Sequence, residues 1–189
     1  MKRALALSFV LITAAACNRA DAPPSRFGFG RAATPAEIQT LDIDVGPDGV
    51  GLPAGQGTAV SGAPVYAAKC ATCHGSAGEG TPIAAALVGR IPNDSFNYAT
   101  STGGDRRKTV GSWWPHATTL YDYIRRAMPF DKPGTLTPDE IYAVTAFLLA
   151  KNEIVKDDFV IDVTSLPAVK MPSRDRFVAD DREKSNRVR

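Results

Sequence analysis

Two cysteines separated by two residues and followed directly by a histidine constrain this 189-residue chain more than any other feature: Cys70-Ala71-Thr72-Cys73-His74. Thiols at this spacing lie one helical turn apart and can bond to the two vinyl groups along one edge of a porphyrin, and the adjacent histidine then reaches iron from the same side. A covalently held haem also supplies a core that a small domain could not otherwise build. The motif therefore predicts one covalent haem c bound through Cys70 and Cys73, with His74 as an iron ligand.

Other interpretations of paired cysteines fit this chain less well. A zinc site built from cysteine and histidine needs four such ligands, and the only other histidine is His116. A thioredoxin-type redox pair needs a βαβ setting, which the sequence pattern does not contain. Haem attachment therefore remains the prediction for Cys70 and Cys73.

The first sixteen residues are expected to be a secretory signal rather than part of the fold. A positive start, Met1-Lys2-Arg3, precedes an uncharged apolar stretch that is too short to cross a bilayer as a helix. The stretch ends in Ala14-Ala15-Ala16, the small-residue pattern of a cleavage site. Residues 1–16 are therefore assigned to a signal peptide, and the mature protein to the periplasm.

Cys17 stands directly after these alanines, in a pattern that resembles the lipobox of bacterial lipoproteins. In that family the cysteine becomes the lipid-modified first residue and tethers the protein to a membrane surface. Ordinary cleavage that leaves a free thiol is the alternative, although such a thiol is a liability in an oxidising compartment. We therefore expect a lipid anchor at Cys17 and no other contact with the membrane.

Removal of the signal also changes the charge balance. Lys2 and Arg3 leave with it, so the mature chain keeps 22 − 2 = 20 basic residues against 20 acidic ones. A net charge of zero and the absence of a recognisable binding motif argue against a nucleic-acid partner.

The mature chain divides into three predicted parts: an irregular leader arm over residues 17–60, a mono-haem domain over residues 61–153 and a tail over residues 154–189. The leader is rich in Gly, Pro and Ala and is either a tether or an arm that wraps the domain or a partner. The tail combines one apolar run, Phe159-Val160-Ile161, with a charged end that is expected to be frayed.

Helices are predicted on both sides of the haem motif. In the leader, residues 35–41 follow Thr34, which forms a capping box with Glu37. Residues 61–72 form a second predicted helix, with Pro64 in its first turn and a compact apolar face that leads directly into the motif. The predicted fold is therefore all-α, with small helices wrapped around the haem.

Two further helices follow a long loop over residues 75–116, which we expect to pack around the cofactor because so long a loop needs something to pack against. Residues 117–127 have apolar side chains at helical spacing. Thr137-Pro138-Asp139-Glu140 is a capping box with proline at the first helical position, and a helix follows it through Ala150. One face of that helix carries an apolar stripe: Ile141, Val144, Thr145, Leu148 and Leu149.

Two methionines of the mature chain are candidates for the sixth iron ligand. A thioether ligand favours reduced iron and suits electron transfer. Met128 lies between two predicted helices, where a loop can fold over the open haem face, whereas Met171 lies in the tail and is expected to be a packing residue. We therefore predict Met128 as the sixth ligand. His116 is the alternative ligand, and its more ordinary role is that of a polar loop residue.

Aromatic and basic residues near Met128 are further candidates. Trp113, Trp114 and Tyr121 could form the wall of the haem pocket, although aromatic residues more often pack in a core. Arg125 and Arg126 could balance the haem propionates or dock an acidic partner surface, although exposed arginines are more often simply solvated. The basic run over residues 106–108 is expected to be solvated.

The motif, Met128 and the capped last helix together resemble class I cytochromes c. Further segments resemble the SoxD-type cytochrome subunit of sulfite dehydrogenases over residues 27–177. These segments are Thr34-Pro-Ala-Glu-Ile, Asp42-Ile-Asp-Val, Pro47-Asp-Gly-Val-Gly-Leu-Pro, Val110-Gly-Ser-Trp-Trp-Pro-His-Ala-Thr-Thr-Leu-Tyr-Asp-Tyr-Ile-Arg-Arg-Ala-Met-Pro-Phe and Leu166-Pro-Ala-Val-Lys-Met-Pro-Ser-Arg-Asp. The resemblance implies a class I cytochrome c fold with irregular extensions at both ends.

The same resemblance implies a function. Members of the family accept electrons from a molybdenum-cofactor subunit that oxidises a sulfur substrate, and pass them to a downstream cytochrome. By this resemblance Cys70 and Cys73 bind haem, His74 is the proximal ligand and Met128 the distal one. Some members carry a second haem domain, whereas this chain has a single C-x-x-C-H, so a smaller sulfite dehydrogenase is as compatible as a full thiosulfate-oxidising complex.

Two other functions remain open at this point. The chain could be a free-standing periplasmic shuttle cytochrome without a dedicated enzyme partner, or a haem enzyme with an open distal site. Apart from the haem no catalytic set is apparent, because Ser112 and His116 have no orienting acid nearby in the sequence. We therefore expect the chain to carry electrons and not to be catalytic alone.

Overall fold

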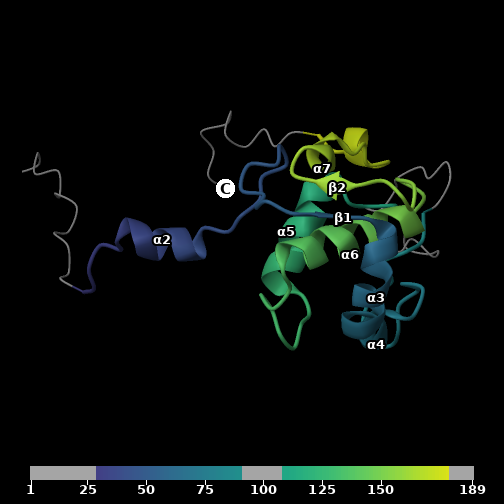
Figure 1. Cartoon of the computed structure of the whole chain (residues 1–189), viewed down its shortest axis with the longest axis horizontal. Helices are drawn as coiled ribbons and strands as arrows, with labels where there is room; N and C mark the ends of the chain where they lie inside the picture. The colour runs from purple at the N-terminus through teal and green to yellow at the C-terminus, as the bar shows by residue number, and fades with distance from the viewer. Residues whose placement is uncertain (1–28, 91–107, 179–189) are drawn as a thin grey trace, which may run out of the picture. The chain divides into compact units, whose positions relative to one another are not determined.

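The computed structural model describes residues 29–90 and 108–178, in two compact units that are treated separately below (Figure 1). The first unit is residues 1–41 and the second is residues 42–189. The expected signal peptide, Cys17, Arg106, Arg107 and the charged end beyond residue 178 lie outside the described residues. Within the described residues, no helix is both long enough and apolar enough to cross a membrane.

The described part of the first unit, residues 29–41, contains helix α2 (Pro35–Leu41), with the predicted bounds. The Thr34 N–H donates to Glu37 Oε2 (2.8 Å), and the Glu37 N–H donates to Thr34 Oγ1 (3.3 Å), which completes the predicted capping box. Arg31 forms an ion pair with Glu37 and holds the pKa of that carboxyl down to about 2. No residue of α2 is buried, and both Ile38 and Leu41 are exposed.

The second unit confirms the predicted helical architecture. Its elements, in chain order, are β1 (Gln56–Gly57), α3 (Ala59–Lys69), α4 (Ala71–His74), α5 (Ala117–Ala127), α6 (Pro138–Lys151), β2 (Ile161–Asp162), α7 (Ser165–Ala168) and the 3-10 turn η2 (Arg174–Arg176). The two strands are short and antiparallel, with Gln56 opposite Asp162 and Gly57 opposite Ile161. The compact unit thus joins the end of the leader to the tail.

Helix α3 differs from its prediction at both ends. It begins two residues earlier than expected, because the Thr58 side chain accepts from the Ser61 N–H (3.2 Å) and the Ser61 side chain accepts from the Thr58 N–H (3.0 Å). This is a capping box with Ser in place of the usual Glu or Gln, so the sequence pattern did not reveal it. Pro64 consequently lies inside the helix rather than in its first turn. The helix also ends at Lys69, and Cys70 separates it from α4.

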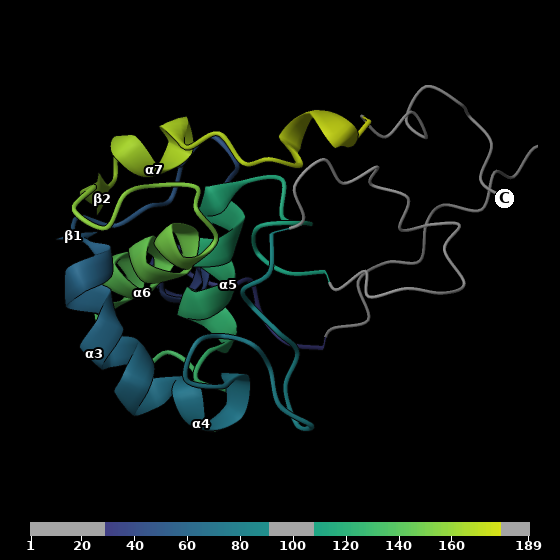
Figure 2. The ribbon, with the colours of Figure 1, turned by 90° about the vertical axis from the view of Figure 1, so that its right-hand side faces the viewer.

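Helix α6 has the predicted start, with Thr137 and Glu140 in a reciprocal capping box and Pro138 at the first position. Its burial differs from the prediction, since every residue from 141 to 149 is buried and not only one stripe. The reason is that α3, α5 and both strands pack around it, as Figure 2 shows. A helix covered on several sides buries its whole circumference.

Glycines allow α3 and β1 to approach the α6 backbone closely. A Cβ placed on Gly62 would lie 2.0 Å from the carbonyl oxygen of Ala143, and one on Gly57 would lie 2.3 Å from the Ala143 nitrogen. No side chain can occupy either position without displacing backbone, so Gly62 allows the close crossing of α3 over α6 and Gly57 allows the close approach of β1.

The tail is more ordered than the sequence suggested. Ile161, Leu166, Val169 and Met171 are buried in the core, whereas Phe159 and Val160 of the apolar run are exposed. The Oγ of Ser173 lies 2.9 Å from the Trp113 carbonyl and 2.8 Å from the Trp114 carbonyl. Alternation of single apolar residues with turns gives no periodic signal, which is why the sequence did not reveal this packing.

Candidate functional site

The haem-attachment motif forms the short helix α4 and its cap. The backbone N–H groups of Cys73 and His74 both donate to the Cys70 carbonyl, at 3.1 and 3.0 Å. Gly75 ends the helix with a φ of 84°, a conformation that favours glycine, so the predicted stop is confirmed. Neither thiol forms a disulfide; Cys73 is exposed, and partial burial raises the pKa of Cys70 to about 11.

The imidazole of His74 has a defined hydrogen-bond partner. Its Nδ1 lies 3.0 Å from the carbonyl oxygen of Ala85. A carbonyl oxygen can only accept, so the proton of the neutral ring must be on Nδ1 and the lone pair must be on Nε2. That is the form in which histidine ligates a metal, with its orientation fixed by the second nitrogen. The arrangement fits an iron ligand.

The loop that carries Ala85 is held close to α4 by backbone bonds. The Gly80 N–H donates to the His74 carbonyl (2.8 Å), and the N–H groups of Leu87 and Val88 both donate to the Gly78 carbonyl (2.8 and 2.9 Å). The described parts of the predicted 75–116 loop contain no helix, which agrees with the prediction. The loop therefore forms a tight turn that returns the chain to the His74 side chain.

A buried tyrosine connects this loop to the core. Tyr66 of α3 is 1 % exposed, packs against Phe147 at 4.7 Å between ring centroids, and donates its hydroxyl to the Gly75 carbonyl (2.9 Å). Burial raises the pKa of Tyr66 to about 12, so the hydroxyl remains a donor over the whole physiological range. The end of α4 is therefore fixed to helices α3 and α6.

The two candidate methionines lie in different environments. Met128 caps the C-terminus of α5, with its N–H donating to the Ile124 carbonyl (3.1 Å), and its side chain is partly buried against the core. Met171 is 4 % exposed and belongs to the core itself. A partly exposed thioether is available to a cofactor, whereas a buried one fills space.

His116 lies at the opposite end of α5 from Met128. It is the N-cap residue of the helix, and Met128 is the C-cap residue. The twelve steps between them correspond to about 18 Å along the axis, so the two side chains belong to different regions of the domain.

The donor set suits a haem c. Two thiols one turn apart, an imidazole whose Nε2 is free to bind and a thioether at a helix end are the groups that such a cofactor requires. Partly buried apolar side chains that pack against the core come from the same segments: Val65, Ala71, Leu87, Val88, Trp114 and Met128.

Tyr121 packs in the core of the domain. It is fully buried against Tyr142 of α6, at 4.5 Å between ring centroids, and burial raises the pKa of its phenol. Trp113 packs edge-on against Phe177 of the tail and under the Lys108 ammonium, which lies 4.3 Å from the ring centroid.

Arg125 and Arg126 have a role that the sequence did not suggest. The Arg125 Nη1 donates to the carbonyls of Ile43 (2.9 Å) and Gly51 (3.2 Å) in the leader. Arg126 forms an ion pair with Asp122, whose Oδ1 also accepts from the buried Val45 N–H (2.9 Å). The hypothesis that these arginines balance propionates is therefore replaced by one in which they hold residues 43–51 against α5.

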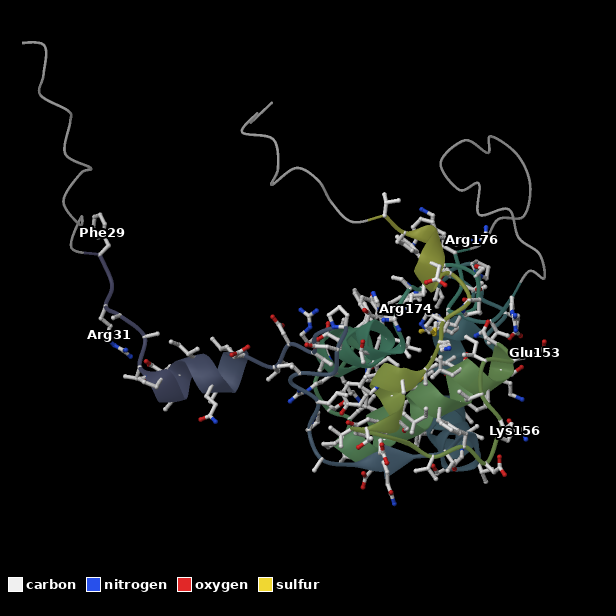
Figure 3. The ribbon with its side chains drawn as sticks, turned by 90° about the horizontal axis from the view of Figure 1, so that it is seen from above. Phe29, Arg31, Glu153, Lys156, Arg174 and Arg176 are labelled. Carbon is white, nitrogen blue, oxygen red and sulfur yellow. The ribbon has the colours of Figure 1, made fainter. Side chains whose placement is uncertain are left out.

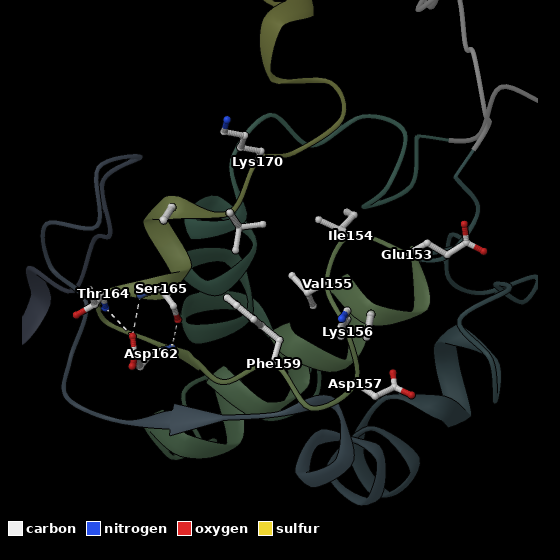
Figure 4. A pocket seen from close by; sticks show the side chains of 13 residues that line it. Glu153, Ile154, Val155, Lys156, Asp157, Phe159, Asp162, Thr164, Ser165 and Lys170 are labelled. Carbon is white, nitrogen blue, oxygen red and sulfur yellow. Dashed lines mark hydrogen bonds between the residues drawn. The ribbon is translucent and has the colours of Figure 1, made fainter.

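A shallow pocket lies away from this site, between the C-terminal end of α6 and the tail (Figure 4). Phe159, Ile154 and Val155 form its apolar part, and Asp162 accepts from the N–H groups of Thr164 and Ser165, both at 2.8 Å. No residue of the haem motif lines it, so the pocket is not part of the candidate site.

Comparisons with known proteins found a family model and a solved structure that match this chain. The family model described as cytochrome C oxidase, cbb3-type, subunit III matches residues 57–148. The crystal structure of the sulfane dehydrogenase SoxCD from Paracoccus pantotrophus contains a chain that is 40% identical, with a TM-score of 0.70, and the match covers 85% of this chain and 76% of that one.

A curated relative is more distant. The thiosulfate dehydrogenase of Allochromatium vinosum (strain ATCC 17899 / DSM 180 / NBRC 103801 / NCIMB 10441 / D) is 27% identical over 112 residues, which are 59% of this chain and 34% of the relative. The matched part thus spans about a third of the length of that relative.

Proposed function

Because the chain belongs to the class I cytochromes c, of the type of the SoxD cytochrome subunit, we propose that it accepts electrons from a molybdenum-cofactor sulfite dehydrogenase. Membership of this family makes the protein an electron-transfer cytochrome with haem c, similar to proteins of sulfur-compound oxidation. The haem, when bound, takes up and releases one electron at a time at its iron.

The proposal assigns a role to each residue of the donor set. Cys70 and Cys73 would hold a single haem through their thiols, and His74 would bind its iron through Nε2, while the Ala85 carbonyl accepts from Nδ1. Met128 supplies the sixth ligand, because it lies at a helix end with a partly exposed thioether. A thioether ligand raises the reduction potential, as an electron acceptor requires.

The observation that carries the proposal is the 40% identity to a chain of a two-component dehydrogenase. The match covers 85% of 189 residues, about 161, whereas residues 42–189 number 148. It therefore extends into the leader, where α2 has exposed Ile38 and Leu41, and where Phe29 and Arg31 precede it (Figure 3). Exposed apolar side chains in the leader, in a chain that matches one of the sulfane dehydrogenase SoxCD, support a leader that binds the dehydrogenase subunit.

Reduction by the partner tests this function. The cytochrome is purified from a host that exports it and attaches haem, and it is mixed with a molybdenum-cofactor sulfite dehydrogenase subunit from the same organism. Sulfite is expected to reduce the haem within the mixture and to leave the cytochrome alone oxidised. The proposal fails if the two proteins neither co-purify nor exchange electrons in the presence of sulfite.

A free-standing shuttle cytochrome is the second candidate, and one observation favours it. Residues 43–53 of the leader bind their own domain through Arg125, Asp122 and Tyr142, without any partner. Amide hydrogen exchange of residues 29–41 distinguishes the two functions: protection that appears only after the dehydrogenase is added supports the subunit, and protection in the isolated protein supports the shuttle.

The cellular location forms part of the proposal. We expect export to the periplasm with removal of residues 1–16, a lipid at Cys17 and delivery of electrons to a downstream cytochrome. Intact-mass spectrometry of the membrane fraction tests the anchor, because a lipidated Cys17 adds a diacylglyceryl group and a Cys17→Ser variant should leave the membrane.

A further inference from the structure

Asn152, at the C-terminal end of α6, is a buried polar residue to which the proposed function assigns no role. Its side chain is 1 % exposed. Its Nδ2 donates to the carbonyls of Leu148 (2.8 Å) and Leu87 (3.1 Å), and its Oδ1 accepts from the Gly89 N–H (3.1 Å). Both amide protons and the carbonyl oxygen are therefore satisfied.

The bonds of Asn152 hold the segment that carries the partner of His74. Leu87 and Gly89 lie two and four residues after Ala85, whose carbonyl accepts from His74 Nδ1. On the side of α4, backbone bonds to Gly78 hold the same segment. Asn152, at the end of α6, bonds to the same segment from the other side. The Ala85 carbonyl therefore lies on a turn that is fixed from two sides.

Packing keeps the Asn152 amide in place. A Cβ placed on Gly111 would lie 2.5 Å from Asn152 Oδ1 and 2.9 Å from its Cβ and Cγ. The Gly111 backbone therefore lies close against the Asn152 side chain. Next to it, the Thr109 hydroxyl donates to the Gly89 carbonyl (3.1 Å), and the Val110 N–H donates to the Leu87 carbonyl (3.1 Å).

We propose that Asn152 is a positioning residue for the proximal iron ligand: it fixes residues 85–89 so that the Ala85 carbonyl holds the Nδ1 proton of His74. The inference rests on the proposed haem role of His74 and is independent of the identity of the electron donor. A strong bond from Nδ1 makes the imidazole a better donor to iron, which stabilises the oxidised state. Loss of Asn152 is therefore expected to raise the reduction potential.

The test compares Asn152→Leu, which keeps a similar volume without hydrogen bonds, with the wild-type holoprotein. A redox titration is expected to show a higher potential, and NMR is expected to show that the Nδ1 proton of His74 exchanges at least ten times faster. Tyr142→Phe is the matched control: it removes one hydrogen bond of a buried α6 side chain, to the Pro53 carbonyl, on the leader side. It should lower the melting temperature and change neither readout.

Gly111→Ala provides a second variant in case Asn152→Leu does not fold, because it presses on the amide without removing it. A smaller rise in potential and in proton exchange is expected. The inference is overturned if the folded variants lose stability while the potential and the exchange rate remain those of the wild type. Failure of the wild-type protein to bind haem covalently contradicts the proposed function instead, so the two failures are distinguishable.

Discussion

Two irregular segments of this domain are held in place by different kinds of side chain: the leader side, residues 43–53, and the haem side, residues 75–89. On each side an irregular segment is held against helices by side chains that bond to its backbone. On the leader side the holding groups include Arg125, which is partly buried, and Asp122, which is buried and ion-paired with Arg126. On the haem side the holding groups are Asn152 and Tyr66, which are neutral and almost completely buried.

The difference follows from the cost of burying charge. A charged group near solvent keeps much of its hydration, whereas a fully buried one needs complete pairing. A fixed charge near a haem would also change its reduction potential, because the local dielectric is low. Neutral groups can thus fix the loop beside His74 without adding a charge there, whereas the charged groups bond to residues 43–51.

Substitution of His74 should give the largest effect and tests whether the haem side is the functional one. His74→Ala removes the proposed proximal ligand, so we expect loss of the low-spin spectrum and of nearly all electron transfer. His116→Ala is the matched control at the other end of α5 and should retain both. Absorption spectra of the two purified variants check this, and an unchanged spectrum in His74→Ala contradicts the assignment.

The two methionines give the next effect. Met128→Ala should remove the far-red absorption band of the sulfur–iron bond from the oxidised protein and lower its reduction potential. Met171→Ala should keep the band and lose about 3 kcal/mol of stability, because it leaves a cavity in the core. Absorption spectra and thermal unfolding of both variants distinguish an iron-ligating methionine from a packing one. Absence of the band from the native protein would contradict the assignment of Met128 as the sixth ligand.

The leader side should respond in stability alone. Asp122→Ala removes the acceptor of the buried Val45 N–H, and we expect a loss of about 2 kcal/mol in the free energy of unfolding. The reduction potential should stay close to its wild-type value, since the bonds of Asp122 go to Val45 and Arg126 and none goes to His74 or its loop. Denaturant unfolding and a redox titration of the same sample provide the check. A shift in potential would show that the two sides are coupled.

Adjacent residues at the start of α6 give the smallest effect and the closest comparison. Asp139 accepts from the Gln56 N–H on the leader side, whereas Glu140 bonds to Thr137 and Lys69 next to the haem motif. The bond from the Thr137 N–H holds the pKa of Glu140 below its usual value of 4.5. Its contribution to stability is therefore complete above pH 4.5 and is lost as the pH falls through the lowered value.

Glu140→Gln keeps the capping box and should remove that part of the acid dependence, at a cost below about 1 kcal/mol at neutral pH. Asp139→Asn, at the adjacent position, is the matched control. Unfolding curves between pH 3 and 7 compare the two variants. An acid dependence of Glu140→Gln equal to that of the wild type contradicts this assignment.

Local sequence signals predicted much of this molecule. Helices α2, α5 and the start of α6 have their predicted bounds, because capping boxes and helical spacing are encoded within a few residues. The haem-attachment motif and the glycine that ends its helix were likewise predicted from a few adjacent residues. The roles of Arg125 and Asn152 were not predictable in this way, since their partners lie 82 and 65 residues away in the chain and leave no periodic pattern.

The burial of α6 and the order of the tail were missed for a related reason. Both depend on packing between segments that are distant in the sequence. Single apolar residues such as Ile161 and Met171 have no regular spacing that would indicate this packing. The close approach of α3 to α6 at Gly62 was not predictable either. From the sequence alone, a glycine within a helix only lowers the predicted helix stability and does not indicate a packing contact.

The pairing of β1 with β2 also has a consequence for the order of folding. Gly57 lies opposite Ile161, so a chain synthesised from its N-terminus cannot close its core until the tail has emerged. His74 precedes that strand by 161 − 74 = 87 residues. During this interval the Cys70 thiol, which the finished core partly covers, is open to chemical modification. The late strand thus provides a period in which both cysteines are accessible before the fold is complete.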